Sequence, residues 1–448
     1  MVLKRMAKNS IIVLNTLVFV WLLNTLPVEP NVAKGLSILV FVGVLWLTEA
    51  IHLTITALLV PLLAAFLGVL SFKQALASFA DPIIFLFMGG FGLAAALSRQ
   101  QLDKAMATAI LRRTGGHLGL ALVLLFVATA GLSMWISNTA TAAMMLPLIL
   151  GLLAQVKGEK VHVTRTFALL GLAYSASIGG IATLVGSPPN AIAAAATGMS
   201  FTEWLIKALP LTLLLLPAAV IVLFLLLRPQ LNQRIAVDEA PFEWSLERKI
   251  TLSIFAVTVF MWVFSKPVNA WLGGVDAFDS VVAVMAMVAL VLFKVVTWRD
   301  MENTTDWGVL LLFGGGLCLS QVLQTTEASL FLGETVGHIV GKVNPLLAVM
   351  VVVAFVVFLT ELASNTASAA LLVPVFVALA PSLGVDPVII ASLIAVSASC
   401  AFMLPVATPP NAIVFGTGHV PQYTMMQVGL YLNIACVLLI SFYAYWVW

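Results

Sequence analysis

The feature that most constrains this chain is a series of apolar stretches too long and too poor in charge for the surface of a water-soluble protein. Residues 206–227 contain a single charged residue, Lys207. A stretch of about 20 apolar residues is enough for a helix to cross the hydrocarbon core of a bilayer. Hydrophobic residues make up 62% of the 448 residues and charged residues only 9%. The chain therefore predicts an all-α polytopic membrane protein, and its formal charge of +2 without a basic tail indicates no nucleic-acid partner.

Two kinds of apolar stretch are present. Stretches that fit about 11 transmembrane helices lie at roughly 10–26, 33–51, 52–70, 80–98, 166–198, 206–227, 250–265, 280–296, 307–323, 387–418 and 427–447. Two others, about 117–154 and about 345–380, are too long for one helix and carry Ser-Asn-Thr near the centre. Each is either two full crossings or a re-entrant hairpin. A tip at mid-membrane would place these polar residues in a cavity, and we expect re-entrant hairpins.

The polar motifs of these stretches occur twice. "WISNTATAAMMLPL" (residues 135–148) matches "LASNTASAALLVPV" (362–375), and "YSASIGGIATLVGSPPNAI" (174–192) matches "VSASCAFMLPVATPPNAIV" (396–414). Asp81 and Asp306 precede a third matching pair of apolar segments and are predicted to be helix N-caps. From the residue numbers, the offsets are 225 for the aspartates, 227 for Ser-Asn-Thr, 222 for Ser-Ala-Ser and 221 for Pro-Pro-Asn. A nearly constant offset in one order indicates an internal repeat.

The repeats are predicted to have opposite orientations in the membrane. Five predicted crossings separate the two Ser-Asn-Thr sites, so the hairpins enter from opposite sides. With the N-terminus inside, the inner face receives 16 of the 21 Lys and Arg residues and the outer face receives five, Lys34, Lys73, Lys207, Lys266 and Lys342. This bias agrees with the positive-inside rule. Two inverted-topology repeats are typical of secondary transporters, whose binding site lies at mid-depth between the repeats.

This layout divides the chain into four parts. A basic N-terminus is followed by an apolar run without a small-residue cleavage site, which predicts a first spanning helix rather than a removed signal. The expected parts are a first transmembrane helix (1–30), a first repeat (31–230), a cytoplasmic linker (231–249) and a second repeat (250–448). Each repeat contains a hairpin, about 117–154 or about 345–380, and a broken helix, about 166–198 or about 387–418.

The Pro-Pro-Asn motifs predict breaks inside apolar helices. Proline lacks an N–H, so the carbonyls of Leu184 and Val185 in the first copy lose their helical partners. Such a break is tolerated in lipid only where protein or a water-filled cavity satisfies it. Freed carbonyls and hydroxyls suit a small cation, and the N-terminus of a resumed helix attracts an anion.

The hairpin tips carry matching oxygen atoms. Ser133 and Thr360 both bear hydroxyl groups, lie 227 residues apart, and share a helix face with Ser137 and Ser364, respectively. Each repeat thus offers hydroxyl, amide and carbonyl oxygens, enough for one cation. Glu361 is an intramembrane acid whose first-repeat counterpart is Met134, so it lies outside the duplicated pattern. Its role, in transport or as a structural partner, is left open by the sequence.

Other functions fit the pattern less well. An intramembrane serine hydrolase would need a base near Ser137 or Ser364, but every histidine lies at a loop or a segment end. A channel would need a repeated acidic or carbonyl filter. A proton-coupled carrier of the same architecture is the closer competitor, although few intramembrane acids are present for a proton relay. We therefore expect a cation-coupled transporter and no enzymatic activity.

Two Ser-Asn-Thr tips, each followed by a Pro-Pro-Asn break, resemble the divalent anion/sodium symporter family, and in particular its bacterial INDY-type sodium/dicarboxylate symporters. The resemblance covers essentially the whole chain. It implies about two sodium sites, the first using Ser133, Ser137, Asn138 and Gly186, and the second using Thr360, Ala363, Asn365 and Ala407. It also implies that the substrate carboxylates are held by Ser137, Asn138, Thr139, Ser364, Asn365 and Thr366, with Thr408 and Pro409 as neighbours.

The resemblance further implies how such a protein works. The expected function is sodium-coupled symport into the cell of four-carbon dicarboxylates such as succinate, malate and fumarate, by a homodimer with an elevator-type mechanism. The expected location is a bacterial inner membrane, with the N-terminus cytoplasmic and the C-terminus periplasmic. A dicarboxylate exchanger stays open as an alternative, and so do citrate and sulfate as substrates. Ala407 stands where the first repeat has Gly186, so the two cation sites need not be equivalent.

Overall fold

The computed structural model describes residues 2–235, 243–340 and 344–448, and part of the predicted linker, residues 236–242, lies outside this range. The described chain is all-helical apart from one isolated bridge between His117 and Arg234. Its first half consists of α1 (Val2–Thr25), α2 (Pro30–Thr48), α3 (Leu53–Phe66), α4 (Phe72–Ala77), η1 (Ser78–Ala80), α5 (Pro82–Arg99), α6 (Leu102–Arg112), α7 (Leu118–Ser133), α8 (Asn138–Leu153), α9 (Val161–Gly179), η2 (Leu184–Gly186), α10 (Pro188–Thr197) and α11 (Phe201–Leu227).

The second half repeats much of this order. It consists of α12 (Leu246–Val263), α13 (Ser265–Trp271), α14 (Phe278–Leu292), α15 (Trp298–Thr304), α16 (Trp307–Thr325), α17 (Ala328–Val340), α18 (Pro345–Thr360), α19 (Asn365–Leu379), η3 (Ala380–Leu383), α20 (Pro387–Ala398), α21 (Pro409–Phe415) and α22 (Gln422–Trp446). Among the described residues, six helical spans are long and apolar enough to cross a membrane, one of them the run Phe72–Arg99 that comprises α4, η1 and α5. Helix α12 with α13 forms a pair bent by 89°. The short helices α6 and α17 were not expected from the sequence.

The long apolar stretches with Ser-Asn-Thr form hairpins. In the first, α7 and α8 have 16 residues each, and in the second, α18 and α19 have 16 and 15. At 1.5 Å per residue each arm is about 24 Å long, shorter than the roughly 30 Å of a bilayer core. The shorter helices α3 and α14, which fill predicted full crossings, have 14 and 15 residues, so length alone does not separate the two alternatives. The re-entrant placement of the Ser-Asn-Thr tips stays a prediction.

The two halves pack against each other reciprocally. Helix α14 begins at residue 278, which is 225 residues after the start of α3 at residue 53. Helix α3 packs against α16, and its counterpart α14 packs against α5, the counterpart of α16. In the same way α10 packs against α19 and α21 packs against α8. This exchange is the packing expected of two inverted repeats that share one core.

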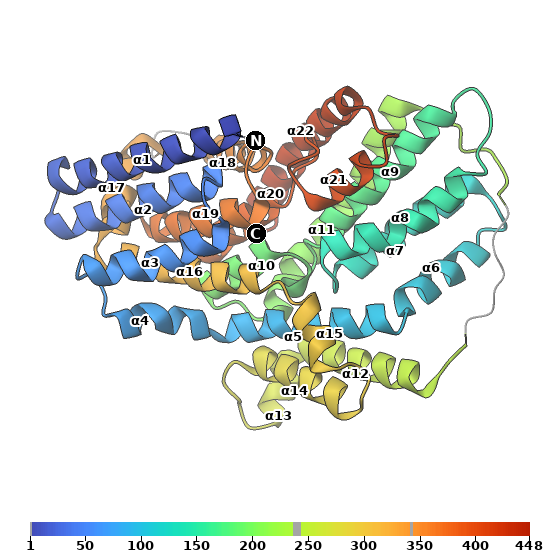
Figure 1. The fold of residues 1–448 in the computed structure, drawn as a ribbon, viewed down its shortest axis with the longest axis horizontal. Coiled ribbons are helices and arrows are strands. Elements are labelled where there is room, and N and C mark those ends of the chain that lie inside the picture. The colour runs from blue at the N-terminus through green and yellow to red at the C-terminus, as the bar shows by residue number, and fades with distance from the viewer. Residues whose placement is uncertain (1, 236–242, 341–343) are drawn as a thin grey trace.

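The helices fall into several groups (Figure 1). Helices α12–α15 lie together below α5, α7, α8 and α9 lie at the right-hand end of the long axis, and α1, α2, α3 and α17 lie at its left-hand end. Asp81 caps α5 by accepting from the N–H of Ile83, and Asp306 caps α16 by accepting from that of Val309. Both predicted N-caps are therefore confirmed.

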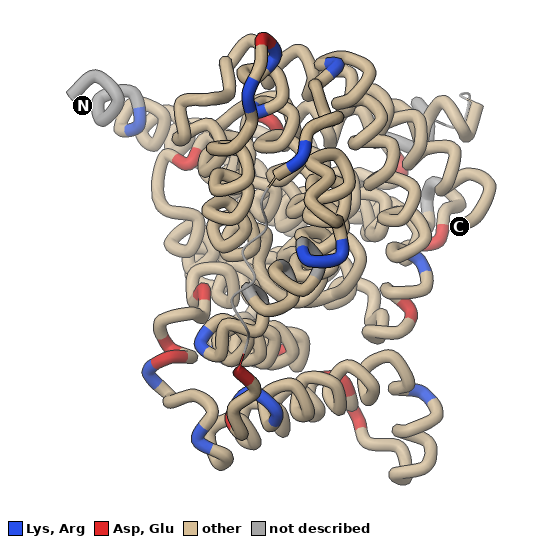
Figure 2. The backbone as a smooth tube through the Cα atoms, turned by 90° about the vertical axis from the view of Figure 1, so that its right-hand side faces the viewer, with Lys and Arg blue, Asp and Glu red and all other residues tan. Residues whose placement is uncertain are grey.

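Loops that the charge pattern assigned to one side of the membrane also lie together. On the predicted inner side, the backbone of residues 116–119 bonds that of 231–235, the Gln233 side chain bonds Lys157, and Arg99 pairs with Asp300. On the predicted outer side, Lys266 pairs with Glu203 at 3.0 Å. Figure 2 shows Lys and Arg on the loops of the face turned to the viewer. The side assignment is thus consistent with the fold.

Close packing of α5 on α14 depends on Gly89. A Cβ at this position would lie 2.5 Å from the Ala283 Cβ and 2.8 Å from the Ala283 carbonyl oxygen. We expect Gly89→Ala to lower the free energy of unfolding by about 1–3 kcal/mol through overpacking, measured as a lower melting temperature in detergent. As the control, Gly151→Ala on α8 meets no atom within 4 Å and should melt at or above the wild-type temperature. Equal losses in both variants would contradict this packing.

Single cysteines test the orientation, because all three native cysteines are buried. Val275 and Glu159 are both exposed and lie on loops of opposite predicted sides. In intact cells we expect Val275→Cys to react with a membrane-impermeant maleimide and Glu159→Cys to react only after permeabilisation, because the positive-inside rule places the 155–160 loop in the cytoplasm. The reverse labelling pattern would show that the chain is inserted the other way round.

Candidate functional site

The tip of the first hairpin brings oxygen atoms from three elements together. Ser133 is fully buried at the end of α7, and its Oγ lies 2.7 Å from Asn138 Oδ1 and 2.7 Å from the carbonyl oxygen of Ala176 on α9. A hydroxyl has one hydrogen, so it can donate to only one of these acceptors. A bound cation would satisfy the remaining oxygen lone pairs. The opposite orientation of the Asn138 amide would also do so, because its NH2 group would then donate to the Ser133 hydroxyl.

The break after α9 adds backbone oxygens to this cluster. A Cβ at Gly180 would overlap Asn138 Oδ1 and lie 2.9 Å from the Gly186 carbonyl oxygen, and a Cβ at Gly186 would lie 3.0 Å from the Ser133 carbonyl oxygen. Glycine at these positions therefore lets the broken helix approach the tip closely. We call Ser133, Asn138, Ala176 and Gly186 the first oxygen cluster.

The second hairpin repeats this arrangement. Thr360 is fully buried at the end of α18, and its Oγ1 lies 2.7 Å from Asn365 Oδ1 and 2.9 Å from the carbonyl oxygen of Ala398 on α20. Ala398 follows Ala176 by 222 residues, the Ser-Ala-Ser offset. We call Thr360, Asn365 and Ala398 the second oxygen cluster. Sequence analysis expected both hydroxyls and both amides but did not expect the Ala176 and Ala398 carbonyls.

The remaining predicted cation residues are placed less directly. Ser137 caps α8, with its Oγ accepting from the Ala140 N–H at 3.3 Å. Ala363 lies in the second tip and Ala407 in the second break, and both are buried. No hydrogen bond described in the structure joins either alanine to the second oxygen cluster. Their assignment therefore rests on the motif match alone.

The predicted substrate residues are more accessible than the clusters. Ser137, Asn138, Ser364, Asn365 and Thr366 are partly exposed, and Thr139 and Pro409 are exposed. Thr408 is buried and caps α21 by accepting from the Asn411 N–H at 3.3 Å. Helices α8 and α19 both begin at the tip asparagine, so their positive ends lie at the tips. Neutral donors and helix ends of this kind favour an anion at the tips.

The asparagine of Pro-Pro-Asn has a structural role that sequence reasoning missed. Asn190 is fully buried, and its Nδ2 donates to the carbonyls of Gly180, Ile181 and Thr183 at 2.7–3.2 Å. Asn411 does the same in the second repeat, with the carbonyls of Ala401 and Leu404 at 3.1 Å. Each amide therefore satisfies carbonyls that the helix break frees. The only signal of this role in the sequence was the position of the asparagine directly after two prolines.

Glu361 is a buried part of the second break. It is 3% exposed, and its Oε1 accepts from the N–H groups of Phe402 at 2.6 Å and Met403 at 2.9 Å and from Asn433 Nδ2 at 2.7 Å. Its Oε2 accepts from the Leu404 N–H at 3.1 Å. The sequence left open whether Glu361 acts in transport or as a structural partner. In the structure, Glu361 is a structural partner of the backbone N–H groups that the second break frees.

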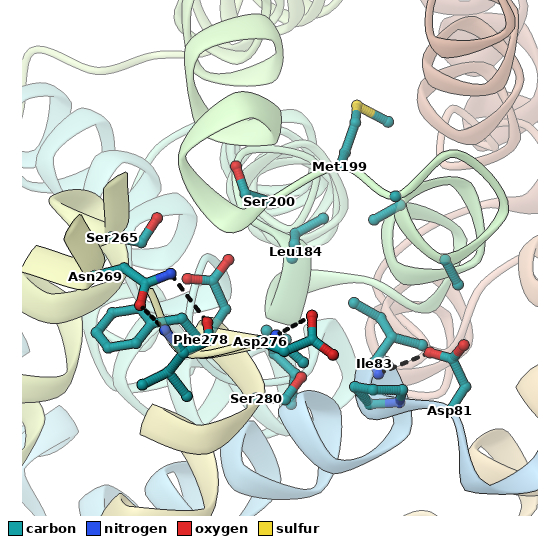
Figure 3. A pocket seen from close by; sticks show the side chains of 18 of the residues that line it. Asp81, Ile83, Leu184, Met199, Ser200, Ser265, Asn269, Asp276, Phe278 and Ser280 are labelled. Carbon is teal, nitrogen blue, oxygen red and sulfur yellow. Dashed lines mark hydrogen bonds between the residues drawn. The ribbon is translucent and has the colours of Figure 1, made fainter. Parts of the chain in front are cut away.

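A cavity lies away from the tips. Its volume is about 460 Å³, and it separates the C-terminal end of α10, at Met199 and Ser200, from the α13–α14 region, at Asn269, Phe278 and Ser280 (Figure 3). No hairpin-tip residue lines it. Among the described residues no group of three or more His, Cys, Asp or Glu forms a metal site. The two oxygen clusters consist of neutral hydroxyl, amide and carbonyl oxygens.

Comparisons with known proteins agree on a transporter. The sequence profile of the citrate transporter family matches residues 43–395. An uncharacterized transporter of Haemophilus influenzae is 50% identical over 452 residues, 99% of this chain and 98% of the relative. The sodium-dependent dicarboxylate transporter SdcS of Staphylococcus saprophyticus is 32% identical over 443 residues, 92% of this chain and 85% of the relative.

A solved structure has a similar fold. The crystal structure of the Alcanivorax borkumensis YdaH transporter aligns with a TM-score of 0.60 and 15% sequence identity, and the alignment covers 84% of this chain and 87% of that one. At this identity the likeness concerns the fold alone. It confirms the expected class, an all-helical polytopic membrane protein.

We expect the buried asparagines to be needed for stability. Replacing Asn190 by Asp removes the amide donor and places carboxylate oxygens against three carbonyls. The expected loss is about 3 kcal/mol of unfolding free energy, measured as a lower melting temperature. The control is Asn24→Asp on the exposed face of α1, where Asn24 Nδ2 donates to Val20 O in contact with solvent or lipid. A melting temperature equal to that of the control would contradict the role of Asn190.

Proposed function

This chain belongs to the citrate transporter family and is a multi-pass membrane secondary transporter rather than an enzyme, and we propose that it carries out sodium-coupled symport of four-carbon dicarboxylates such as succinate, malate and fumarate. The observation that carries the proposal is the duplicated oxygen cluster, in which a buried hydroxyl lies within 2.9 Å of an amide oxygen and a carbonyl oxygen in each repeat. Unwound backbone and helix ends at mid-depth hold coupling ions in transporters built from inverted repeats.

Each cluster holds one sodium ion in this proposal. The first uses Ser133, Ser137, Asn138 and Gly186, and the second uses Thr360, Ala363, Asn365 and Ala407. Hard cations prefer oxygen ligands, and neutral oxygens fit a singly charged ion. The similarity to SdcS, a sodium-dependent dicarboxylate transporter, supports this choice of ion.

The substrate lies between the two tips in this proposal. Its carboxylates accept from the hydroxyls, amides and helix N-termini of Ser137, Asn138, Thr139, Ser364, Asn365 and Thr366, beside Thr408 and Pro409. Two sodium ions close to the tips would supply the positive potential that a dianion requires. The packing of α10 on α19 and of α21 on α8 supports a shared site, because each broken helix contacts the hairpin of the other repeat.

Transport itself would follow an elevator-type path. The hairpins and broken helices would move together past a scaffold that includes α5 and α12–α15. The cavity between α10 and the α13–α14 region supports this division, because loosely packed boundaries are where rigid parts move past each other. The protein would act as a homodimer in a bacterial inner membrane, with the N-terminus cytoplasmic and the C-terminus periplasmic.

Coupling to protons is the main competing proposal. Glu361 is the acid closest to the tips in sequence, and four donors already occupy its oxygens. Protonation would turn one oxygen from an acceptor into a donor facing another donor. This arrangement favours a structural carboxylate over a proton carrier, and hence sodium coupling.

Uptake into proteoliposomes tests the proposal. We expect radiolabelled succinate to accumulate under an inward sodium gradient and not when choline replaces sodium. Asn138→Ala and Asn365→Ala should each reduce uptake by about tenfold or more, because each removes an oxygen from both the cation and the substrate site. Asn24→Ala, on the exposed face of α1, is the control with normal uptake.

Three outcomes would contradict parts of this proposal. Full uptake in choline would argue for proton coupling, and normal uptake by either tip variant would argue against the site. Uptake that requires unlabelled dicarboxylate inside the vesicle would indicate exchange. Unlabelled citrate that competes better than succinate would move the substrate assignment to a tricarboxylate, in line with the name of the citrate transporter family.

A further inference from the structure

The two helix breaks are held in different ways. In the first repeat, the N–H groups of Gly180, Ile181 and Ala182 donate to carbonyls of their own helix, those of Ala176, Ile178 and Gly179, at 3.1–3.2 Å. The corresponding N–H groups of the second repeat, on residues 402–404, all donate to the Glu361 carboxylate. In the first break, carbonyls of the same helix therefore accept from these N–H groups. In the second break, a carboxylate side chain from the hairpin tip accepts from them.

Glu361 also contacts α22 directly and is linked to α9 through Phe402. Asn433 on α22 donates to its Oε1 at 2.7 Å and is fully buried. The peptide of Phe402 is held from both sides, because its N–H donates to Glu361 and its carbonyl accepts from the Tyr174 hydroxyl at 2.8 Å. Tyr174 lies on α9, two residues before Ala176 of the first oxygen cluster. The Glu361 carboxylate thus holds the Phe402 peptide, which also bonds the first repeat through Tyr174.

Glu361 is next to the second oxygen cluster in sequence, and its partners, residues 402–404, follow Ala398 of that cluster by four to six residues. Glu361 directly follows Thr360, whose hydroxyl belongs to that cluster. Its counterpart in the first repeat, Met134, is neutral. An ionised Glu361 carries a charge of −1, and charges interact more strongly in a low-dielectric interior than in water. A cation in the second cluster would therefore be attracted more strongly than one in the first.

We propose that Glu361 is a positioning residue that holds the second helix break in shape and makes the second oxygen cluster the tighter of the two sodium sites. The inference rests on the proposed sodium coupling, which it deepens by ranking the two sites. The tighter site fills first as sodium rises. Binding there orders the second tip before the first cluster and the substrate are filled.

Sodium titration of the purified protein tests this proposal without transport. The melting temperature in detergent is followed as sodium replaces choline at constant ionic strength and without substrate. Glu361→Gln keeps the size of the side chain but removes its charge and replaces one acceptor by a donor. We expect the sodium concentration at half of the full shift to rise by about tenfold, which corresponds to about 1.4 kcal/mol of lost binding free energy.

Matched variants separate this role from a general loss of stability. Met134→Gln changes the equivalent position of the first repeat and should leave the half-saturating sodium concentration at the wild-type value. Asn433→Leu removes one of the four donors to Glu361 and leaves the carboxylate in place, so a rise of about threefold is expected. If Glu361→Gln does not fold, the Asn433→Leu titration decides, because the proposal requires its shift.

The outcomes distinguish this inference from the function on which it rests. A sodium-responsive wild type together with unchanged half-saturation in Glu361→Gln, or in Asn433→Leu, would overturn the inference alone. An equal rise in Met134→Gln would also overturn it, because the effect would then not belong to the second cluster. A wild type that does not respond to sodium would overturn the sodium coupling and the ranking of the sites together.

Discussion

A helix that is broken inside a bilayer must find partners within the protein for the backbone groups that the break frees, because lipid offers none. The rest of this structure depends on how that requirement is met. Asn190 and Asn411 satisfy freed carbonyls in the two breaks, and Glu361 satisfies freed N–H groups in the second. With these partners in place, the breaks can approach the hairpin tips, and the oxygen clusters form where they meet. The proposed cation sites thus follow from a structural necessity.

The duplicated clusters also explain why so few charged residues are needed. Ser133 and Thr360 each place one hydroxyl hydrogen among two acceptor oxygens, which creates a surplus of oxygen lone pairs in a buried place. Burial of these oxygen atoms costs free energy when the cluster is empty, and a small cation bound there would offset that cost. An anion that binds at the adjacent helix ends then meets positive charge that is present only when the cations are bound. Neutral residues can in this way link the binding of the two ions.

Much of this arrangement was predictable from the sequence, and its limits have physical causes. Repeated motifs and apolar lengths predicted both hairpins, both breaks and the N-caps Asp81 and Asp306, because these depend on local pattern and spacing. The roles of Asn190 and Ala176 were not predictable in the same way. Asn190 acts through a side chain that reaches carbonyls seven to ten residues earlier in the chain. Ala176 acts through a backbone carbonyl that any residue could supply. The partners of Glu361 lie 41–72 residues away, beyond any local signal.

The departure from symmetry at Glu361 follows from the same constraint. Two inverted repeats share one core, but they need not satisfy their breaks by the same groups. Gly179 and Gly180 let the first break continue its helical hydrogen bonds to residue 182, whereas the second repeat has Ala401 and Phe402 at the corresponding positions and leaves its helix earlier, at Ala398. The N–H groups that are thereby released need acceptors, and a carboxylate supplies several at once. In our proposal, a charge introduced to satisfy the backbone then acts on a nearby cation and gives two structurally matched sites different affinities.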